Sequence, residues 1–146
     1  MLSAMRNLDR ALSADGIIKV STMVQMGVLG SNFPPSAGSF SQGYMAHVAQ
    51  YMQSTGAPLL ANGDIDINYA LVITSPGTVV HDIDNGYNYH NMFDAMVDSF
   101  YSALENAGAR NVTVVMSKSG WPSAVSNAAN VCNSQIYSQN LINHVG

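Results

Sequence analysis

The residues best suited to chemistry lie in the segment 112–123, which reads Val-Thr-Val-Val-Met-Ser-Lys-Ser-Gly-Trp-Pro-Ser. Its first half alternates apolar residues and is rich in valine, which is typical of a β-strand. Polar residues 117–120 end the strand, and Trp121 follows in a proline-containing turn. In α/β folds, ligands meet catalytic groups at the carboxyl ends of strands. The segment therefore predicts a site around Lys118 and Trp121.

Lys118 has one possible chemistry of its own. A lysine amine acts as a nucleophile by forming a Schiff base, which requires a carbonyl substrate and a closed pocket. The sequence indicates neither, so we interpret Lys118 as unreactive. Ser117 and Ser123 have no recognisable base partner, and we interpret His81 and His90 as surface histidines.

The elements that must position this site alternate between helices and strands. Apolar residues three or four apart predict helices at residues 2–13, about 40–55, 91–107 and 127–144. Short apolar or β-branched runs predict strands at residues 17–24, 59–61 and 112–117. This alternation predicts a parallel sheet with right-handed crossovers, in one α/β domain without linkers.

Local signals predict where these elements end and which faces pack. Ser39 or Ser41 is the expected N-cap of the second helix, and Gly108 is expected just past the third. Adjacent prolines predict a loop at residues 30–38. The packing face of the last helix is predicted to contain Ala128, Cys132, Ile136 and Ile142.

Composition limits the ligands that the chain is expected to bind. Only 10% of its 146 residues are charged and the net charge is -4, which favours neither nucleic acid nor an anionic membrane as a partner. Its one cysteine, Cys132, excludes an internal disulfide and a cysteine metal cluster. Asp64 and Asp66 lie in a polar turn without a histidine at ligand spacing, so they are interpreted as loop residues. We expect no metal and no cofactor.

The amino-terminal residues predict no secretory segment. Arg6, Asp9 and Arg10 fall where a signal peptide requires an uninterrupted apolar core. No apolar run approaches the length that crosses a bilayer. A chain made as written is therefore expected to stay in the cytosol.

Ordered motifs run through nearly the whole chain. They include Ala-Met-Arg-Asn at 4–7, Ile-Lys-Val-Ser-Thr at 18–22, Pro-Pro-Ser-Ala-Gly at 34–38, Ser-Thr-Gly-Ala-Pro-Leu-Leu-Ala-Asn at 54–62 and Gln-Asn-Leu-Ile-Asn-His-Val-Gly at 139–146. With the Gly-Trp-Pro-Ser run at 120–123, they resemble glycoside hydrolase family 17, the plant-type β-1,3-glucanases. The resemblance implies a (β/α)8 TIM barrel, of which residues 1–146 would form one partial domain with strands five to seven. It also implies hydrolysis of O-glycosyl bonds in β-1,3-glucan with retention, and family members are usually secreted.

Three departures from the family pattern bear on activity. The family nucleophile is a glutamate in Ser-Glu-Ser-Gly-Trp-Pro-Ser, and Lys118 occupies its position. The family acid/base glutamate belongs to a Gly-Asn-Glu motif that would precede Met1. Asn62 runs directly into Gly-Asp-Ile-Asp at 63–66, as if the aromatic loop that lines the glucan cleft in the family were deleted. Glu105, the single glutamate of the chain, lies on the predicted polar face of a helix and is interpreted as a surface charge.

Two classes of function follow from these departures. The first is a retaining β-1,3-glucan hydrolase, which is what the family resemblance implies. The second, which we favour for this chain, is a non-catalytic protein that either binds glucan weakly or has a structural role. Asn62 and Trp121 are the candidate substrate-binding residues, although the indole of Trp121 could equally fill the core. A half barrel would also leave sheet edges open, which predicts self-association.

Overall fold

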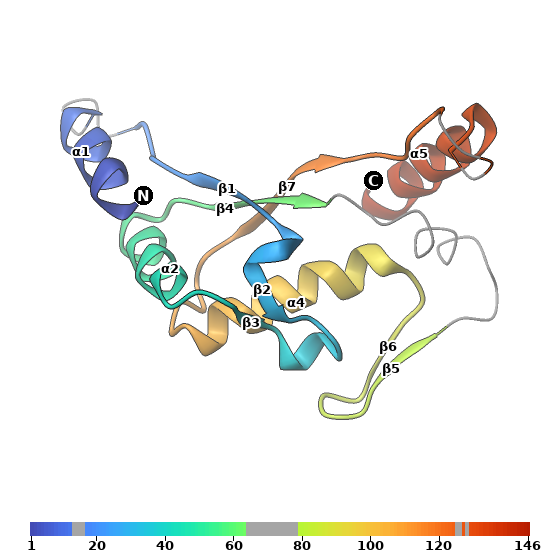
Figure 1. Cartoon of the computed structure of the whole chain (residues 1–146), viewed down its shortest axis with the longest axis horizontal. Helices are drawn as coiled ribbons and strands as arrows, with labels where there is room; N and C mark the ends of the chain where they lie inside the picture. Colours follow the sequence, from blue (N-terminus) through green and yellow to red (C-terminus); the bar gives the residue numbers. More distant parts are fainter. Residues whose placement is uncertain (13–16, 64–78, 125–126, 128) are drawn as a thin grey trace.

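The computed structural model describes residues 1–12, 17–63, 79–124, 127 and 129–146 (Figure 1). These residues form four helices: α1 (Leu2–Leu12), α2 (Tyr44–Thr55), α4 (Met92–Asn106) and α5 (Val131–Val145). The strands are β1 (Thr22–Gln25), β2 (Leu29–Ser31), β3 (Ser39–Phe40), β4 (Leu59–Gly63), β5 (Val80–Asp82), β6 (Tyr87–Tyr89) and β7 (Val114–Ser119). Two 3-10 turns, η1 (Met26–Val28) and η2 (Pro35–Ala37), complete the described elements.

The central feature is a three-stranded parallel sheet in the order β1-β4-β7. The alternation of helices and strands predicted this parallel pairing, and the resemblance to a barrel, in which consecutive strands are neighbours, implies that β4 lies between the other two strands. Both expectations are confirmed. Because each outer strand pairs with β4 alone among the described residues, β1 and β7 form the two edges of this sheet.

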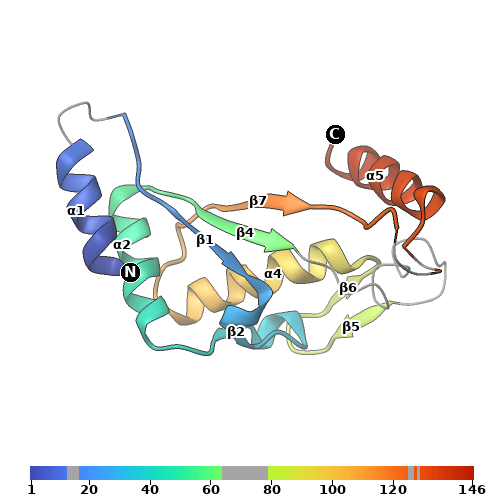
Figure 2. The same ribbon diagram turned by 45° about the horizontal axis from the view of Figure 1, so that its top comes forward.

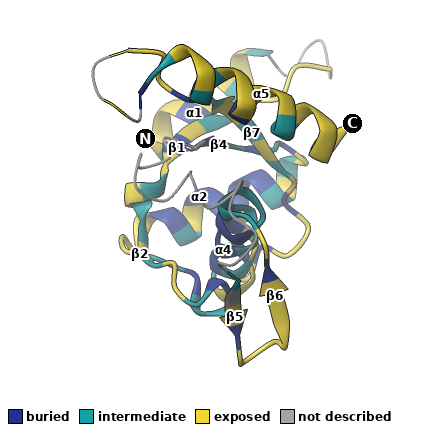
Figure 3. Ribbon diagram, turned by 90° about the vertical axis from the view of Figure 1, so that its right-hand side faces the viewer, coloured by how far each residue is buried: buried dark blue, intermediate teal, exposed yellow. Residues whose placement is uncertain are grey.

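Two helices cover one face of this sheet. Figures 2 and 3 show α2 and α4 on the same side of the three strands. Leu59 of β4, Val48 of α2 and Phe100 of α4 are fully buried in one apolar cluster. Burying such a side chain stabilises the fold by about 1.5–3 kcal/mol. In this cluster α2 contributes five residues and α4 contributes two, Phe100 and Leu104.

The first strand is shorter than predicted. Residues 17–24 were expected to be extended, but β1 begins at Thr22, which pairs with Leu59. The helix stop at Gly56 and the adjacent Pro58 delay the start of β4. Since a strand requires a partner, Ile17 and Ile18 remain exposed before the pairing begins.

Two small antiparallel pairs were not predicted. The expected loop at residues 30–38 contains η2 and lies between the paired strands β2 and β3. Strands β5 and β6 form a second pair, with Val80 opposite Tyr89. These strands are only two or three residues long, too short for a period of two to be recognised in the sequence.

The residues at the helix ends agree only in part with the predicted end signals. Neither Ser39 nor Ser41 caps α2, because its N-cap is Gly43 and the Ser41 hydroxyl donates instead to the Val28 carbonyl. After the carboxyl end of α4, Gly108 has a φ of 74°, the left-handed conformation expected of a residue that follows a helix. The glycine signal was therefore correct, whereas the serine signal was wrong.

The last helix does not pack as predicted. Its expected packing face included Cys132, Ile136 and Ile142, yet all three are exposed, and Ala128 lies outside the described residues. Tyr137 is the buried residue of α5. Figure 1 shows α5 past the carboxyl end of β7 and apart from α2, which lies at the other end of the sheet. No helix in the described part of the chain is long and apolar enough to cross a membrane.

Candidate functional site

A β-bulge in β7 determines where Lys118 points. Ala61 of β4 pairs with Met116, but the next residue, Asn62, pairs with Lys118. Ser117 is thus an extra residue on β7, and its hydroxyl donates to the Ala61 carbonyl over 3.2 Å. A bulge of this kind shifts the alternation of side chains by one residue.

The shift moves Lys118 to the face opposite the helices. Val114 and Met116 pack against the core that α2 and α4 form, and strict alternation would place Lys118 on that same apolar face. Because the bulge inserts one residue after Met116, Lys118 instead shares a face with its register partner Asn62. The bulge therefore keeps a lysine side chain out of the core and presents it at the carboxyl end of the sheet.

Three polar side chains form a row across that end of the sheet. Gln25 of β1 is in register with Asn62 of β4, which is in register with Lys118 of β7. We call these residues the polar row. Gln25 and Lys118 are exposed, whereas Asn62 is only 4% exposed and its side-chain Oδ1 has no hydrogen-bond partner. The structure thus brings together two predicted site residues, Asn62 and Lys118, and adds Gln25, which the sequence did not single out.

Trp121 lies against the last helix. It is 8% exposed, and its ring centroid lies 6.0 Å from that of Tyr137. The Ser134 hydroxyl of α5 donates to the Trp121 carbonyl, and the Tyr137 hydroxyl hydrogen-bonds the Ser119 side chain. The indole is therefore mostly enclosed by protein, so core filling accounts for its position in this structure.

The one glutamate of the chain lies at the surface. Glu105 is exposed on α4, and its carboxylate lies 3.6 Å from the Arg110 guanidinium at the surface, in agreement with its predicted role. Asp64 and Asp66 lie outside the described residues. Within those that are described, no group of three potential metal-binding side chains occurs.

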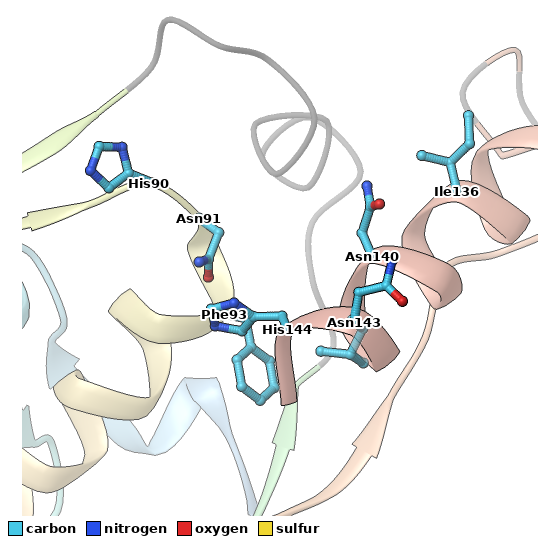
Figure 4. Close-up of a pocket in the computed structure, with 8 residues that line it drawn as sticks. His90, Asn91, Phe93, Ile136, Asn140, Asn143 and His144 are labelled. Atoms are coloured by element: carbon cyan, nitrogen blue, oxygen red, sulfur yellow. The ribbon is translucent and has the colours of Figure 1, made fainter. Parts of the chain in front are cut away.

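An open pocket of about 650 Å³ separates the start of α4 from the end of α5 (Figure 4). His144 of α5 approaches Asp94 of α4, with 2.8 Å between its Nε2 and the carboxylate, and its ring meets that of Phe93 edge to face. His90 lies on the pocket wall, whereas His81 pairs with Asn88 across the β5–β6 hairpin. The sequence offered no signal for the His144–Asp94 pair, because its members are 50 residues apart.

Two buried groups anchor the β5–β6 hairpin. Burial and the hydrogen bond to Asp98 raise the pKa of Tyr89 to about 12, so its hydroxyl remains a donor. Burial alone would raise the pKa of Asp82, but hydrogen bonds from Ser36 and from nearby backbone N–H groups outweigh it and hold the pKa below its ordinary value. The hairpin is thus fixed by side chains that the sequence analysis did not select.

The fold and the site together define a parallel α/β unit with its polar residues at the carboxyl ends of the strands. The family described as Glycosyl hydrolases family 17 matches residues 1–146. The chain therefore belongs to this family, as its motifs indicated.

Individual relatives agree with this assignment. The chain is 58% identical to the glucan endo-1,3-beta-glucosidase acidic isoform of Zea mays and 52% identical to glucan endo-1,3-beta-glucosidase GII of Hordeum vulgare. Each alignment includes the whole chain but only 47% of the relative, so the chain spans about half the length of these curated relatives. A solved structure from a study of two plant beta-glucan endohydrolases with distinct substrate specificities superposes with a TM-score of 0.87 at 43% identity, over 99% of this chain and 52% of that one.

Proposed function

We propose that this chain is a non-catalytic member of the β-1,3-glucanase family. The proposal rests on Lys118, which lies at the carboxyl end of β7 in register with Asn62 and which the motif resemblance assigns to the position of the family nucleophile. Retaining glycosidases need two carboxyl groups about 5–5.5 Å apart, one to attack the sugar and one to protonate the leaving oxygen. A lysine cannot replace the attacking carboxylate.

The charge of the substitution strengthens this argument. Glycoside cleavage proceeds through a transition state that resembles an oxocarbenium ion and carries developing positive charge. A carboxylate beside that charge stabilises it, whereas an ammonium group repels it. Glu105, the one glutamate of the chain, contacts Arg110 on the surface of α4 and cannot compensate.

Hydrolysis of laminarin, a β-1,3-glucan, tests the proposal. We expect no release of reducing sugar by the purified chain during long incubation. The glucan endo-1,3-beta-glucosidase of Zea mays serves as the positive control for the assay, and lysine at its position equivalent to Lys118 should abolish its turnover. Turnover by this chain that disappears in a Lys118→Met variant would refute a non-catalytic role.

Restoring the carboxylate alone should not restore activity. The Lys118→Glu variant of the 146-residue chain would regain a nucleophile but no acid/base partner. Loss of general acid catalysis costs about 10²–10⁴ in rate, so turnover should remain undetectable. Robust turnover by Lys118→Glu would instead mean that another group of this chain acts as the acid.

The chain as a partial barrel domain, with strands five to seven of a (β/α)8 barrel, is a further part of this proposal. The parallel order β1-β4-β7 supports it. Met23, Leu60 and Val115 are in register across the three strands, on the face opposite the core. Met23 is 57% and Val115 is 41% exposed, so this apolar row is open to solvent. In a closed barrel such side chains pack against opposite strands.

Exposed apolar side chains between two free strand edges favour self-association of the isolated chain. Light scattering after size exclusion should therefore give a mass above 15.5 kDa at micromolar concentration. Val115→Lys should shift the population towards monomer, because it places a charge in the apolar row. Ile83→Lys is the matched control, since Ile83 is 90% exposed in the hairpin turn, outside this sheet. A monomeric parent, or equal effects of both variants, would contradict this assembly.

Glucan, if it binds, should bind weakly. Both candidate contacts, Asn62 and Trp121, are buried, and the burial of Trp121 leaves little of its indole to stack on a sugar ring. Titration with laminari-oligosaccharides, followed by Trp121 fluorescence, checks this expectation. Saturation at micromolar concentrations would show a better-formed binding surface than we propose.

A further inference from the structure

A second pocket lies between the β5–β6 hairpin and helix α4 and shares no residue with the polar row. Its volume is about 340 Å³, within the range of about 300–1,000 Å³ that is typical of small-molecule sites. Three aromatic rings line it, those of Tyr87, Tyr89 and Phe93, together with the carboxylates of Asp94 and Asp98. The pocket therefore combines aromatic surface with negative charge.

Local geometry brings these two kinds of group together. Tyr87 and Tyr89 are two residues apart on β6, so both side chains lie on one face of the strand, where their rings meet edge to face with centroids 6.5 Å apart. Asp94 and Asp98 are four residues apart on α4 and likewise share a face. Strand β6 leads directly into α4 (Figure 1), and the Tyr89 hydroxyl donates to the Asp98 carboxylate over 2.7 Å.

The two carboxylates differ in how far their charge is compensated. Both oxygens of Asp94 are bonded, Oδ1 to His144 Nε2 and Oδ2 to Asn91 Nδ2, each over 2.8 Å. Asp98 uses only Oδ2, which accepts from the neutral hydroxyl of Tyr89, and its Oδ1 has no hydrogen-bond donor among the described residues. No lysine or arginine lines the described part of the pocket. Asp98 thus leaves one negative charge beside the aromatic rings.

This combination favours an organic cation that carries few hydrogen-bond donors. An aromatic face attracts a cation within about 6 Å of its centroid, and Tyr87 is 61% exposed, so its ring is accessible. A primary ammonium is strongly hydrated and needs three acceptors. The pocket offers few, because the side-chain oxygen of Asn88 already lies 2.6 Å from a ring nitrogen of His81. A quaternary ammonium has no donors, and its methyl groups pack against aromatic rings.

We propose that this pocket binds a small quaternary ammonium compound. The cation lies against the ring of Tyr87 with Asp98 as its counter-charge, and Tyr89 positions that carboxylate. A phosphocholine headgroup fits less well, because its phosphate would approach two aspartates on a chain of net charge -4. The inference is independent of the proposed function, since it uses neither Lys118 nor a glucan.

The test compares choline with three close analogues at one ionic strength. The neutral 3,3-dimethylbutan-1-ol has the shape of choline without its charge, ethanolamine has the charge on a primary ammonium, and phosphocholine adds the anionic group of a lipid headgroup. Nitrogen-15-edited spectra of the full chain follow the backbone amides of Tyr87 and Asn88 during each titration. We expect choline to bind about tenfold more tightly than each analogue, a difference of about 1.4 kcal/mol.

Variants separate the aromatic face from the charge. Tyr87→Leu keeps an apolar side chain without the ring, and Asp98→Asn removes the charge but keeps an oxygen that can accept from Tyr89. Each should weaken choline binding by about fivefold and change binding of the neutral alcohol by less than about twofold. Tyr44→Leu and Asp84→Asn are the matched controls, because both residues are exposed and neither lines the pocket. They should bind choline like the parent, and circular dichroism verifies that every variant is folded.

Several outcomes would overturn the inference. Absence of choline binding, or equal affinity for choline and 3,3-dimethylbutan-1-ol, would leave only an apolar depression. Ethanolamine bound as tightly as choline would show general attraction of cations, and phosphocholine bound as tightly would reassign the pocket to a lipid headgroup. Losses in the control variants equal to those in Tyr87→Leu and Asp98→Asn would remove the assignment to these side chains.

Discussion

Asp82 ties the β5–β6 hairpin to η2, and its removal should detach these segments from each other. Its carboxylate accepts hydrogen bonds from the backbone N–H and the hydroxyl of Ser36, each over 2.7 Å. The Asp84 N–H donates to the same carboxylate over 3.3 Å. Asp82 is 1% exposed, so water cannot replace these bonds without local opening.

The cost of the Asp82→Ala substitution follows from these contacts. Hydrogen bonds to charged groups contribute about 1.5–3 kcal/mol, and buried donors that lose their partner cost about 1–3 kcal/mol. Since Ser36 carries two of the donors, the effects overlap, and we expect a total loss of about 3 kcal/mol. That loss corresponds to an increase of roughly 100-fold in the opening equilibrium of the hairpin.

Hydrogen exchange of the Ser36 amide measures this opening directly. Asp82→Ala should accelerate its exchange by roughly two orders of magnitude, a change that 3 kcal/mol predicts. Asp84→Ala is the matched control, because Asp84 is exposed and bonds the Asp82 carboxylate through its backbone N–H, which the substitution keeps. Similar exchange rates in both variants would refute the idea that the Asp82 carboxylate holds the hairpin.

The same contacts give the hairpin a pH dependence of defined sign. Because the folded pKa of Asp82 lies below its unfolded value, its stabilisation is fully present above the ordinary Asp pKa of about 3.9 and is lost as the pH falls through the folded pKa. Exchange of the Ser36 amide, corrected for its intrinsic pH dependence, should therefore accelerate in acid in the parent. In Asp82→Asn this acid acceleration should be reduced, and an unchanged profile would argue against Asp82 as the titrating group.

Two other changes, one substitution and one deletion, test the core and the bulge. Phe100→Ala should lower the free energy of unfolding by about 3–5 kcal/mol in urea titrations. Phe33→Ala, the control at an exposed phenylalanine, should change it by less than about 0.5 kcal/mol, and equal losses in the two variants would contradict the assigned core. Deletion of Ser117 should restore strict alternation in β7 and direct Lys118 towards the core, which should destabilise the chain by several kcal/mol, about the cost of burying an unpaired charge. Unchanged stability and unchanged reactivity of Lys118 towards amine reagents would show that the bulge does not determine its orientation.

Much of the architecture could be predicted from the sequence because it depends on local periodicity. The apolar stripe of α4 repeats at the helical period, and its Gly108 end signal depends on backbone conformation at one residue. The order of the three strands was expected from the family resemblance, which makes them consecutive strands of a barrel and therefore neighbours. The identity of the residue at 118, and the proposal about catalysis that we draw from it, also required no coordinates, because they rest on motif positions.

The remaining features depend on partners distant in the chain. Ser36 and Asp82 are 46 residues apart, and nothing near either residue indicates their hydrogen bonds. The apolar stripe of α5 has the pattern of a packing face, but packing requires an opposing surface, and Ile136 and Ile142 remain exposed.

The direction of the Lys118 side chain shows most clearly what the sequence determines and what only the tertiary structure decides. The sequence alone determined that a lysine follows an apolar strand at the carboxyl end of the sheet. Counting alternate residues from Val114 and Met116 would have pointed that lysine into the core. Only the pairing with β4, in which Asn62 meets Lys118 rather than Ser117, places it on the open face. The physical reason is that strand register is set by the hydrogen bonds between two paired strands, so the sequence of one strand alone cannot specify it.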